Sequence, residues 1–126
     1  MSAFKPMAQN FIHDIIDQDL ANDPSLKIHT RFPPEPNGYL HIGSAKAIRI
    51  NYGTAKKYGG LFNLRYDDTN PVKENDDFVK AIYEDLLWLG AVPDAVCYGS
   101  DYFDKCYEFA VELIKKGKAY VCDLDA

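Results

Sequence analysis

Residues 27–66 read KIHTRFPPEPNGYLHIGSAKAIRINYGTAKKYGGLFNLRY, and their pattern predicts the central elements of the fold. Its two ends, residues 27–32 and 61–66, alternate apolar and polar side chains with the period of two that is typical of β-strands. Between them, residues 42–58 contain no proline and carry an apolar stripe at helical spacing, and Gly59-Gly60 follows as a natural helix end. A strand, a helix and a strand within about forty residues predict a βαβ unit with parallel strands.

The flanking sequence adds elements on both sides of this unit. Apolar residues at helical spacing predict helices at 9–21 and about 73–89, and residues 95–98 predict a short third strand. With no internal repeat and no linker, the chain is expected to be a single α/β unit, a Rossmann-like parallel sheet with flanking helices.

A fourth helix is predicted at 102–116, with Ser100 or Asp101 as its N-cap. Residues 118–122 then resume an extended pattern. We expect the apolar stripe of this helix to face the core; it consists of Phe103, Tyr107, Ala110, Val111 and Ile114.

Composition excludes several classes of protein. With 126 residues, 47% hydrophobic and 26% charged, the chain has the profile of one globular unit rather than of a disordered segment. No apolar run approaches the roughly 20 residues of a membrane span, and the start has no hydrophobic signal core, so a cytoplasmic protein without membrane contact is expected. The net charge of −5 comes from acidic residues concentrated in 61–126, which indicates a solvated face and not a nucleic-acid groove.

The three cysteines, Cys97, Cys106 and Cys122, are odd in number and have no metal-ligand spacing. We expect reduced, half-buried thiols and no metal site.

Candidate chemistry lies in residues 31–46 and 65–71, because parallel α/β sheets bind ligands beyond the C-terminal ends of their strands. Gly38 and Gly43 have the spacing of a phosphate loop, but the Lys-Ser/Thr that completes such a loop is missing, and no dinucleotide fingerprint occurs. What remains is His41-Ile-Gly-Ser44, which opens a helix after a proline-rich loop. Free amides at a helix start attract anions, so this segment is a candidate nucleotide site.

Plain structural interpretations stay open for the same residues. His41 is equally explained as a helix-capping or surface histidine, and Gly43 as a site of close helix packing. Asp67 and Asp68 are equally explained as a turn held by side-chain bonds to the backbone before Pro71.

The run Arg31-Phe-Pro-Pro-Glu-Pro-Asn-Gly-Tyr-Leu-His-Ile-Gly-Ser-Ala-Lys46 resembles the first signature of the class I aminoacyl-tRNA synthetases. Its Pro-Pro-Glu-Pro-Asn-Gly form is similar to the glutaminyl branch of that family, whereas bacterial glutamyl members usually have Ala-Pro-Ser-Pro-Thr-Gly. Archaeal and eukaryotic glutamyl members are the alternative. Three further stretches carry the same resemblance, at 10–20, 63–74 and 100–104.

The resemblance implies that residues 1–126 are the N-terminal half of a class I catalytic, nucleotide-binding domain. The second half, the acceptor-stem and anticodon-binding domains and the Lys-Met-Ser-Lys-Ser signature are not in this sequence. It further implies a monomeric enzyme that activates L-glutamine with ATP and Mg²⁺, transfers it to tRNA(Gln) and holds no tightly bound cofactor. For these residues alone we expect a nucleotide-binding module without catalysis, with apolar surface exposed where the other half packs.

The resemblance also assigns roles to individual residues. Asp67 would hold the α-amino group of glutamine, and Arg31 would help to bind that substrate. His41 and Ser44 would be catalytic, with His41 donating a hydrogen bond to the phosphates; Ser44 stands where the family more often has a second histidine, so it can donate but carries no charge, unless Lys46 supplies one. The full set of expected ATP contacts is Glu35, Pro36, Asn37, His41, Ile42, Gly43, Ser44, Ala45, Lys46 and Ala47.

Overall fold

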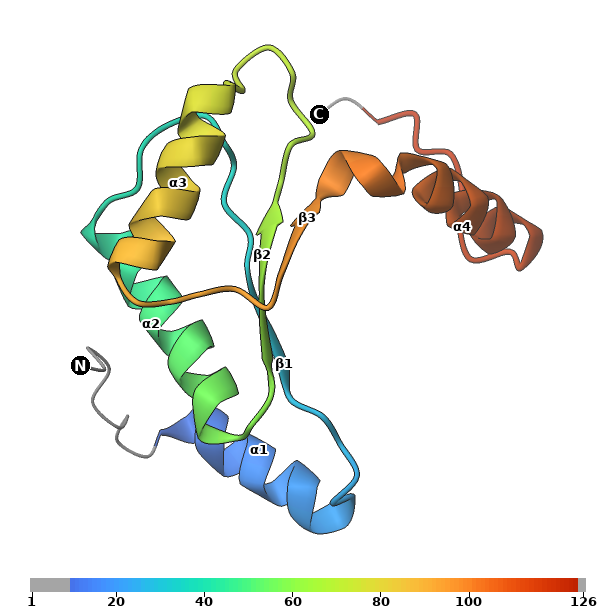
Figure 1. Ribbon diagram of the computed structural model, residues 1–126. Helices are drawn as coiled ribbons and strands as arrows, with labels where there is room; N and C mark the ends of the chain where they lie inside the picture. Colours follow the sequence, from blue (N-terminus) through green and yellow to red (C-terminus); the bar gives the residue numbers. More distant parts are fainter. Residues whose placement is uncertain (1–9, 125–126) are drawn as a thin grey trace.

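A computed structural model describes residues 10–124 (Figure 1). Four helices and three strands alternate along most of the chain, with one 3-10 turn, η1, before the last helix. In chain order the elements are α1 (Phe11–Asn22), β1 (His29–Phe32), α2 (Ile42–Lys57), β2 (Leu61–Tyr66), α3 (Asp76–Trp88), β3 (Ala95–Tyr98), η1 (Gly99–Tyr102) and α4 (Phe103–Lys115).

The three strands form one parallel sheet in the order β1-β2-β3, as the predicted βαβ unit requires. His29 lies opposite Leu61, and Asn63 lies opposite Ala95. The connecting helices α2 and α3 lie on the same side of the sheet (Figure 1). The α/β class is therefore confirmed, and the second and third strands have the predicted bounds, whereas β1 begins at His29 and not at residue 27.

The core lies between the sheet and α2 and α3, because the alternation in each strand turns every second side chain toward the helices. Tyr66, at the end of β2, is buried; its hydroxyl donates to the carbonyl of Val79 at 2.6 Å, and its ring stacks on Tyr98. Burial raises the pKa of the Tyr66 phenol well above its ordinary value. The buried apolar residues are Phe32, Ile48, Ala55, Phe62, Leu64, Tyr66, Ile82, Leu86 and Ala91.

Two helices begin later than predicted because side chains cap them. In α1 the Asn10 side chain accepts from the amides of Ile12 and His13, so the helix starts at Phe11; residue 9 of the predicted helix lies outside the described residues. In α3 the cap is Asn75, which accepts from the Asp77 amide, and the helix starts at Asp76 rather than near residue 73.

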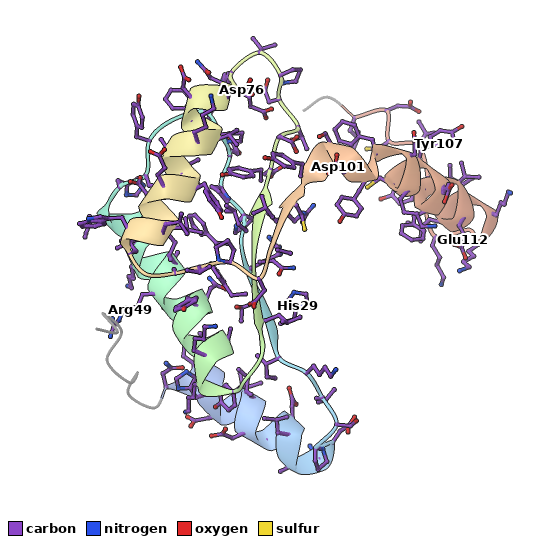
Figure 2. The ribbon with its side chains drawn as sticks, viewed as in Figure 1. His29, Arg49, Asp76, Asp101, Tyr107 and Glu112 are labelled. Atoms are coloured by element: carbon purple, nitrogen blue, oxygen red, sulfur yellow. The ribbon has the colours of Figure 1, made fainter. Side chains whose placement is uncertain are left out.

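The inward apolar stripe predicted for the last helix is wrong. No residue of α4 is buried: Tyr107 is 73% exposed and Ile114 63%, because η1 directs the helix away from the sheet (Figure 1). Figure 2 shows the labelled Tyr107 and Glu112 on this projecting helix. The predicted cap is also wrong, since the N-cap is Tyr102 without a side-chain bond and Ser100 lies in η1. Residues 118–122 form no strand.

The structure agrees with only part of what was expected for the cysteines. All three cysteines are free thiols, but only Cys97 is half-buried, whereas Cys106 and Cys122 are exposed. Within residues 10–124, none of the helices has the length and apolar character that crossing a membrane demands.

Candidate functional site

The loops that follow β1 and β2 are joined at the C-terminal edge of the sheet. The Asp67 amide donates to the carbonyl of Pro34 at 2.9 Å, and the Asn75 amide donates to the carbonyl of Pro36 at 3.2 Å. The Pro36 ring is fully buried, while Asn37 donates from its side chain to the Glu35 carboxylate at 2.7 Å. Two main-chain bonds and a buried proline thus hold residues 33–40 as a stiff ledge beside the start of α2.

His41 is the N-cap of α2, so the capping interpretation of this residue is confirmed. Its backbone is extended (φ −133°, ψ 177°), and its Nδ1 accepts a hydrogen bond from the Gly43 amide at 3.0 Å. Because Nδ1 accepts, the hydrogen of the neutral ring lies on Nε2. The cap therefore leaves an exposed Nε2–H that can donate to an anion at the helix start.

Ser44 completes the cap from the other direction. Its Oγ accepts from the His41 amide at 3.4 Å, which makes a capping box with the histidine in the leading position. A serine hydroxyl can accept one bond and still donate its own hydrogen. Ser44 can therefore serve the cap and a phosphate oxygen together, which a carboxylate at this position could not.

The other expected ATP contacts divide into accessible and inaccessible side chains. Ile42 is 88% exposed, and Lys46 is exposed beside it on a cavity of about 550 Å³, which Ala45 also lines. Ala47 packs against the hydrophobic core, so its side chain does not face a ligand. A contact from Ala47 would have to come through the backbone, where its carbonyl already accepts from Asn51 at 3.0 Å.

Gly43 keeps the His41 ring in its capping position. A Cβ at residue 43 would stand 2.7 Å from Cε1 and 3.0 Å from Nδ1 of His41, so the close contact lies within one turn rather than between helices. We expect Gly43→Ala to displace the ring and lower any activity that uses Nε2–H about tenfold to a hundredfold. Stability should change by less than about 1 kcal/mol, because the gain in helix propensity offsets the weaker cap. Kinetics and urea unfolding of the variant test both parts, and unchanged kinetics would contradict this role of Gly43.

Arg31 lies on the face of the sheet that points away from α2 and α3. It lines a cavity of about 490 Å³ together with His29, Thr30, Asn63, Arg65, Cys97 and Tyr102. Figure 2 shows His29 on this face, opposite the helices. Arg31 was predicted from the sequence as a site residue, whereas Arg65 and Asn63 were not, although both are polar positions of the alternation in β2. The signal for these two residues was that β2 carries polar side chains, because a parallel strand is usually apolar on both faces.

Asp67 follows β2 directly and is exposed. Its carboxylate accepts from the Thr69 hydroxyl at 3.2 Å, and so keeps acceptor capacity for an ammonium group. Asp68 is held across the chain: its carboxylate accepts from the amide and the hydroxyl of Ser100, 32 positions away, and also from its own amide and that of Gly99. A local turn therefore does not account for what the Asp68 carboxylate binds.

The pKa of Asp68 is lowered on balance. Burial acts to raise it, but the hydrogen bonds from the Ser100 hydroxyl and from backbone amides favour the charged form and outweigh burial. A group with a depressed folded-state pKa stabilises the fold above its ordinary value of 3.8, and this contribution is lost as the pH falls through the folded-state pKa. We expect Asp68→Asn to lower the urea midpoint equally at pH 7 and pH 5 and by less near pH 3. An equal effect at all three values would contradict this.

The predicted residues therefore occupy two places. Arg31 lines the cavity on the uncovered sheet face, whereas His41 lines a cavity of about 280 Å³ between α2 and α3 with Leu40, Ile42, Ala45, Asp85, Trp88 and Leu89. The loop of residues 33–40 connects the end of β1 to the start of α2, and main-chain bonds join it to the loop after β2. Among residues 10–124 no group of three or more His, Cys, Asp or Glu side chains is arranged to hold a metal ion.

Comparisons with known proteins point in one direction. The family model described as "tRNA synthetases class I (E and Q), catalytic domain" matches residues 27–126. The glutamine--tRNA ligase of Vibrio cholerae serotype O1 is 58% identical over 125 residues, which cover 98% of this chain and 22% of that protein. The enzyme of the same name from Psychromonas ingrahamii is 60% identical over 119 residues, 93% of this chain and 22% of that protein.

A solved structure of a glutamate tRNA ligase is similar at lower identity. The glutamate tRNA ligase from Elizabethkingia meningosepticum, determined in complex with its amino acid, superposes with a TM-score of 0.68 and 30% identity. The match covers 71% of this chain and 20% of that one. The chain thus spans about a fifth of the length of the relatives that it matches.

Proposed function

This chain belongs to the class I tRNA synthetases for glutamate and glutamine, and we propose that it forms the N-terminal part of the catalytic domain of a glutamine--tRNA ligase. The structural observation that carries the proposal is the start of α2. There His41 presents Nε2–H beside the positive end of a 16-residue helix. Identities of 58% and 60% with glutamine--tRNA ligases support glutamine as the amino acid.

The first step forms an adenylate from glutamine and ATP. A carboxylate oxygen of glutamine attacks the α-phosphorus, the bond to the β-phosphate breaks, and pyrophosphate leaves. Negative charge grows on the phosphate oxygens, so the protein has to align the reactants and stabilise that charge. His41 Nε2–H and the Ser44 hydroxyl are donors for it, while the α2 amides add partial positive charge.

The two substrates would approach the joined loops from different sides. The ledge of residues 33–40 supports ATP through Glu35, Pro36 and Asn37, and its bond to the Asp67 amide aligns it with the glutamine site. The exposed Asp67 carboxylate pairs with the α-ammonium group, and Arg31 lies in the adjoining cavity. In the second step a ribose hydroxyl at the tRNA 3′ end attacks the adenylate carbonyl and AMP leaves, which gives glutaminyl-tRNA(Gln).

We propose that Mg²⁺ arrives with ATP, bound to its phosphates, since residues 10–124 contain no group of three or more His, Cys, Asp or Glu side chains that could hold the ion. When bound, the ion neutralises phosphate charge. We further propose that the enzyme is a cytoplasmic monomer, as befits the charging of tRNA for translation.

The test is pyrophosphate exchange into ATP by the full-length gene product that carries this chain. We expect exchange that depends on glutamine. Exchange driven by glutamate and not by glutamine would overturn the glutamine assignment in favour of a glutamyl enzyme of archaeal or eukaryotic type. The 126-residue chain should be assayed in parallel by ATP titration and exchange. ATP binding without exchange is expected, and catalysis by the chain alone would contradict the module interpretation.

A further inference from the structure

We propose that Asp68 is a positioning residue that, through Ser100, holds the loop after β2 against η1 and so fixes Asp67 at the amino-acid site. The inference rests on the proposed function, because it concerns where glutamine binds. Asp68 itself is directed at Ser100 and need not touch the substrate. Its role is to set the position of its neighbours.

The contact between Asp68 and Ser100 uses both carboxylate oxygens. One accepts from the Ser100 amide at 2.9 Å, and the other accepts from the Ser100 hydroxyl at 2.5 Å. Two bonds from one residue to one carboxylate fix orientation as well as distance. Because the residues are 32 positions apart, this contact joins two separate segments of the chain.

The surroundings leave the contact little freedom. Gly99 is buried, and a Cβ there would lie 3.3 Å from Asp68 Oδ1 and 3.4 Å from the Tyr66 carbonyl oxygen. Just before the contact, at the ends of β2 and β3, the rings of Tyr66 and Tyr98 stack with centroids 5.2 Å apart and hold the two strand ends together. No ion pair among residues 10–124 involves Asp68, so neutral hydrogen-bond donors hold this carboxylate.

Residues of the proposed glutamine site flank the contact on both sides. Asp67 precedes Asp68 and its own amide is held by Pro34, so the main chain of Asp67 and the side chain of Asp68 are both held. Tyr102 follows Ser100 by two positions and lines the cavity that contains Arg31. Pairing of the Asp67 carboxylate with an ammonium group depends on its position, and a displacement of about 1 Å can cost as much as a hundredfold in rate.

The experiment uses Asp68→Asn, Ser100→Ala and Ser100→Thr in the full-length gene product. We expect Asp68→Asn and Ser100→Ala to raise KM for glutamine roughly tenfold and to leave KM for ATP near the wild-type value. Ser100→Thr keeps an amide and a hydroxyl, so it should restore most of the affinity for glutamine. KM for glutamine in the double variant should be no higher than in the more impaired single variant, because both changes remove the same contact.

A matched control lies far from the site. The Asp23 carboxylate also accepts from the amide and the hydroxyl of a serine, Ser25, at 2.9 Å and 2.6 Å, but within an exposed turn only two positions long. Asp23→Asn removes the same chemistry and should leave both KM values unchanged.

Three outcomes would contradict the positioning role of Asp68, and they differ in whether the proposed function also fails. An unchanged KM for glutamine in Asp68→Asn and Ser100→Ala overturns the positioning role while the proposed function stands. Equal increases in both KM values, without rescue by Ser100→Thr, also overturn it, because they indicate a general loss of structure. If wild-type protein shows no glutamine-dependent exchange, the proposed function fails and the inference fails with it. Should Asp68→Asn not fold, Ser100→Ala, which keeps the carboxylate and the amide bond, decides the matter.

Discussion

Gly60→Ala is expected to lower the free energy of unfolding by roughly 3 kcal/mol, near the upper end of the range for overpacking. A Cβ at residue 60 would stand 2.1 Å from the carbonyl oxygen of Ile28 and 2.8 Å from its carbonyl carbon. Side-chain rotation cannot relieve this clash, because both atoms are backbone. The same carbonyl accepts from the Leu61 amide at 2.9 Å, so relief would have to separate the chain before β1 from the start of β2.

Thermal and urea unfolding of the 126-residue chain measure this effect, which for a domain of this size corresponds to a drop of roughly 10 °C in Tm. Gly38→Ala is the matched control, since a Cβ there meets nothing within 4 Å and the residue has no positive φ. Its effect should stay within about 0.5 kcal/mol. Equal midpoints for Gly60→Ala and Gly38→Ala would show that the close approach of residue 60 to Ile28 does not constrain the fold.

His41→Asn is expected to lower kcat for pyrophosphate exchange by about a hundredfold or more without a loss of stability. Asparagine is among the preferred N-cap residues, so the start of α2 stays capped. What is removed is the Nε2–H donor, which the bond from the Gly43 amide to Nδ1 leaves directed outward. His41→Ala should lose both functions and cost roughly 1 kcal/mol of stability besides.

The pair of substitutions separates capping from catalysis. Exchange is measured with the full-length gene product, and urea unfolding with the 126-residue chain. If His41→Asn keeps exchange and His41→Ala loses it, the histidine acts only as a helix cap. If both keep exchange, the proposed phosphate contact of His41 is wrong.

The predicted parts of the fold are those whose signals are local. Period-two alternation at residues 61–66 matched β2 to the residue, because strand pairing turns alternate side chains to one face, and the short strand predicted at 95–98 matched β3. The start of α2 was predicted for the same reason, since capping depends on residues within one turn. The start of α3 was missed by three residues because acidic residues suit either a first turn or a loop, and only the Asn75 cap decides.

The candidate site was predictable only in part. Residue types and the family resemblance pointed to the loop of residues 33–40 and to His41; in the structure this loop is bonded to the loop after β2, and His41 is the N-cap of α2. The cavity around Arg31 was not foreseen beyond that residue. Its other walls come from β2, β3 and η1, so they are neighbours only once the sheet is formed.

The strands and helices of the βαβ unit and the capped start of α2 could be predicted from the sequence, since each depends on residues a few positions apart, and a helical connection between two strands implies that they pair in parallel. The position of α4, the partner of Asp68 and the reason for a glycine at residue 60 became visible in the tertiary structure alone. The stripe on α4 has the helical period of a core helix, yet η1 turns it away from the sheet and leaves it exposed. The contact between Asp68 and Ser100 spans 32 positions, and the approach of Gly60 to Ile28 spans the whole of α2. Such contacts follow from how the strands are stacked side by side, which no short window of sequence contains.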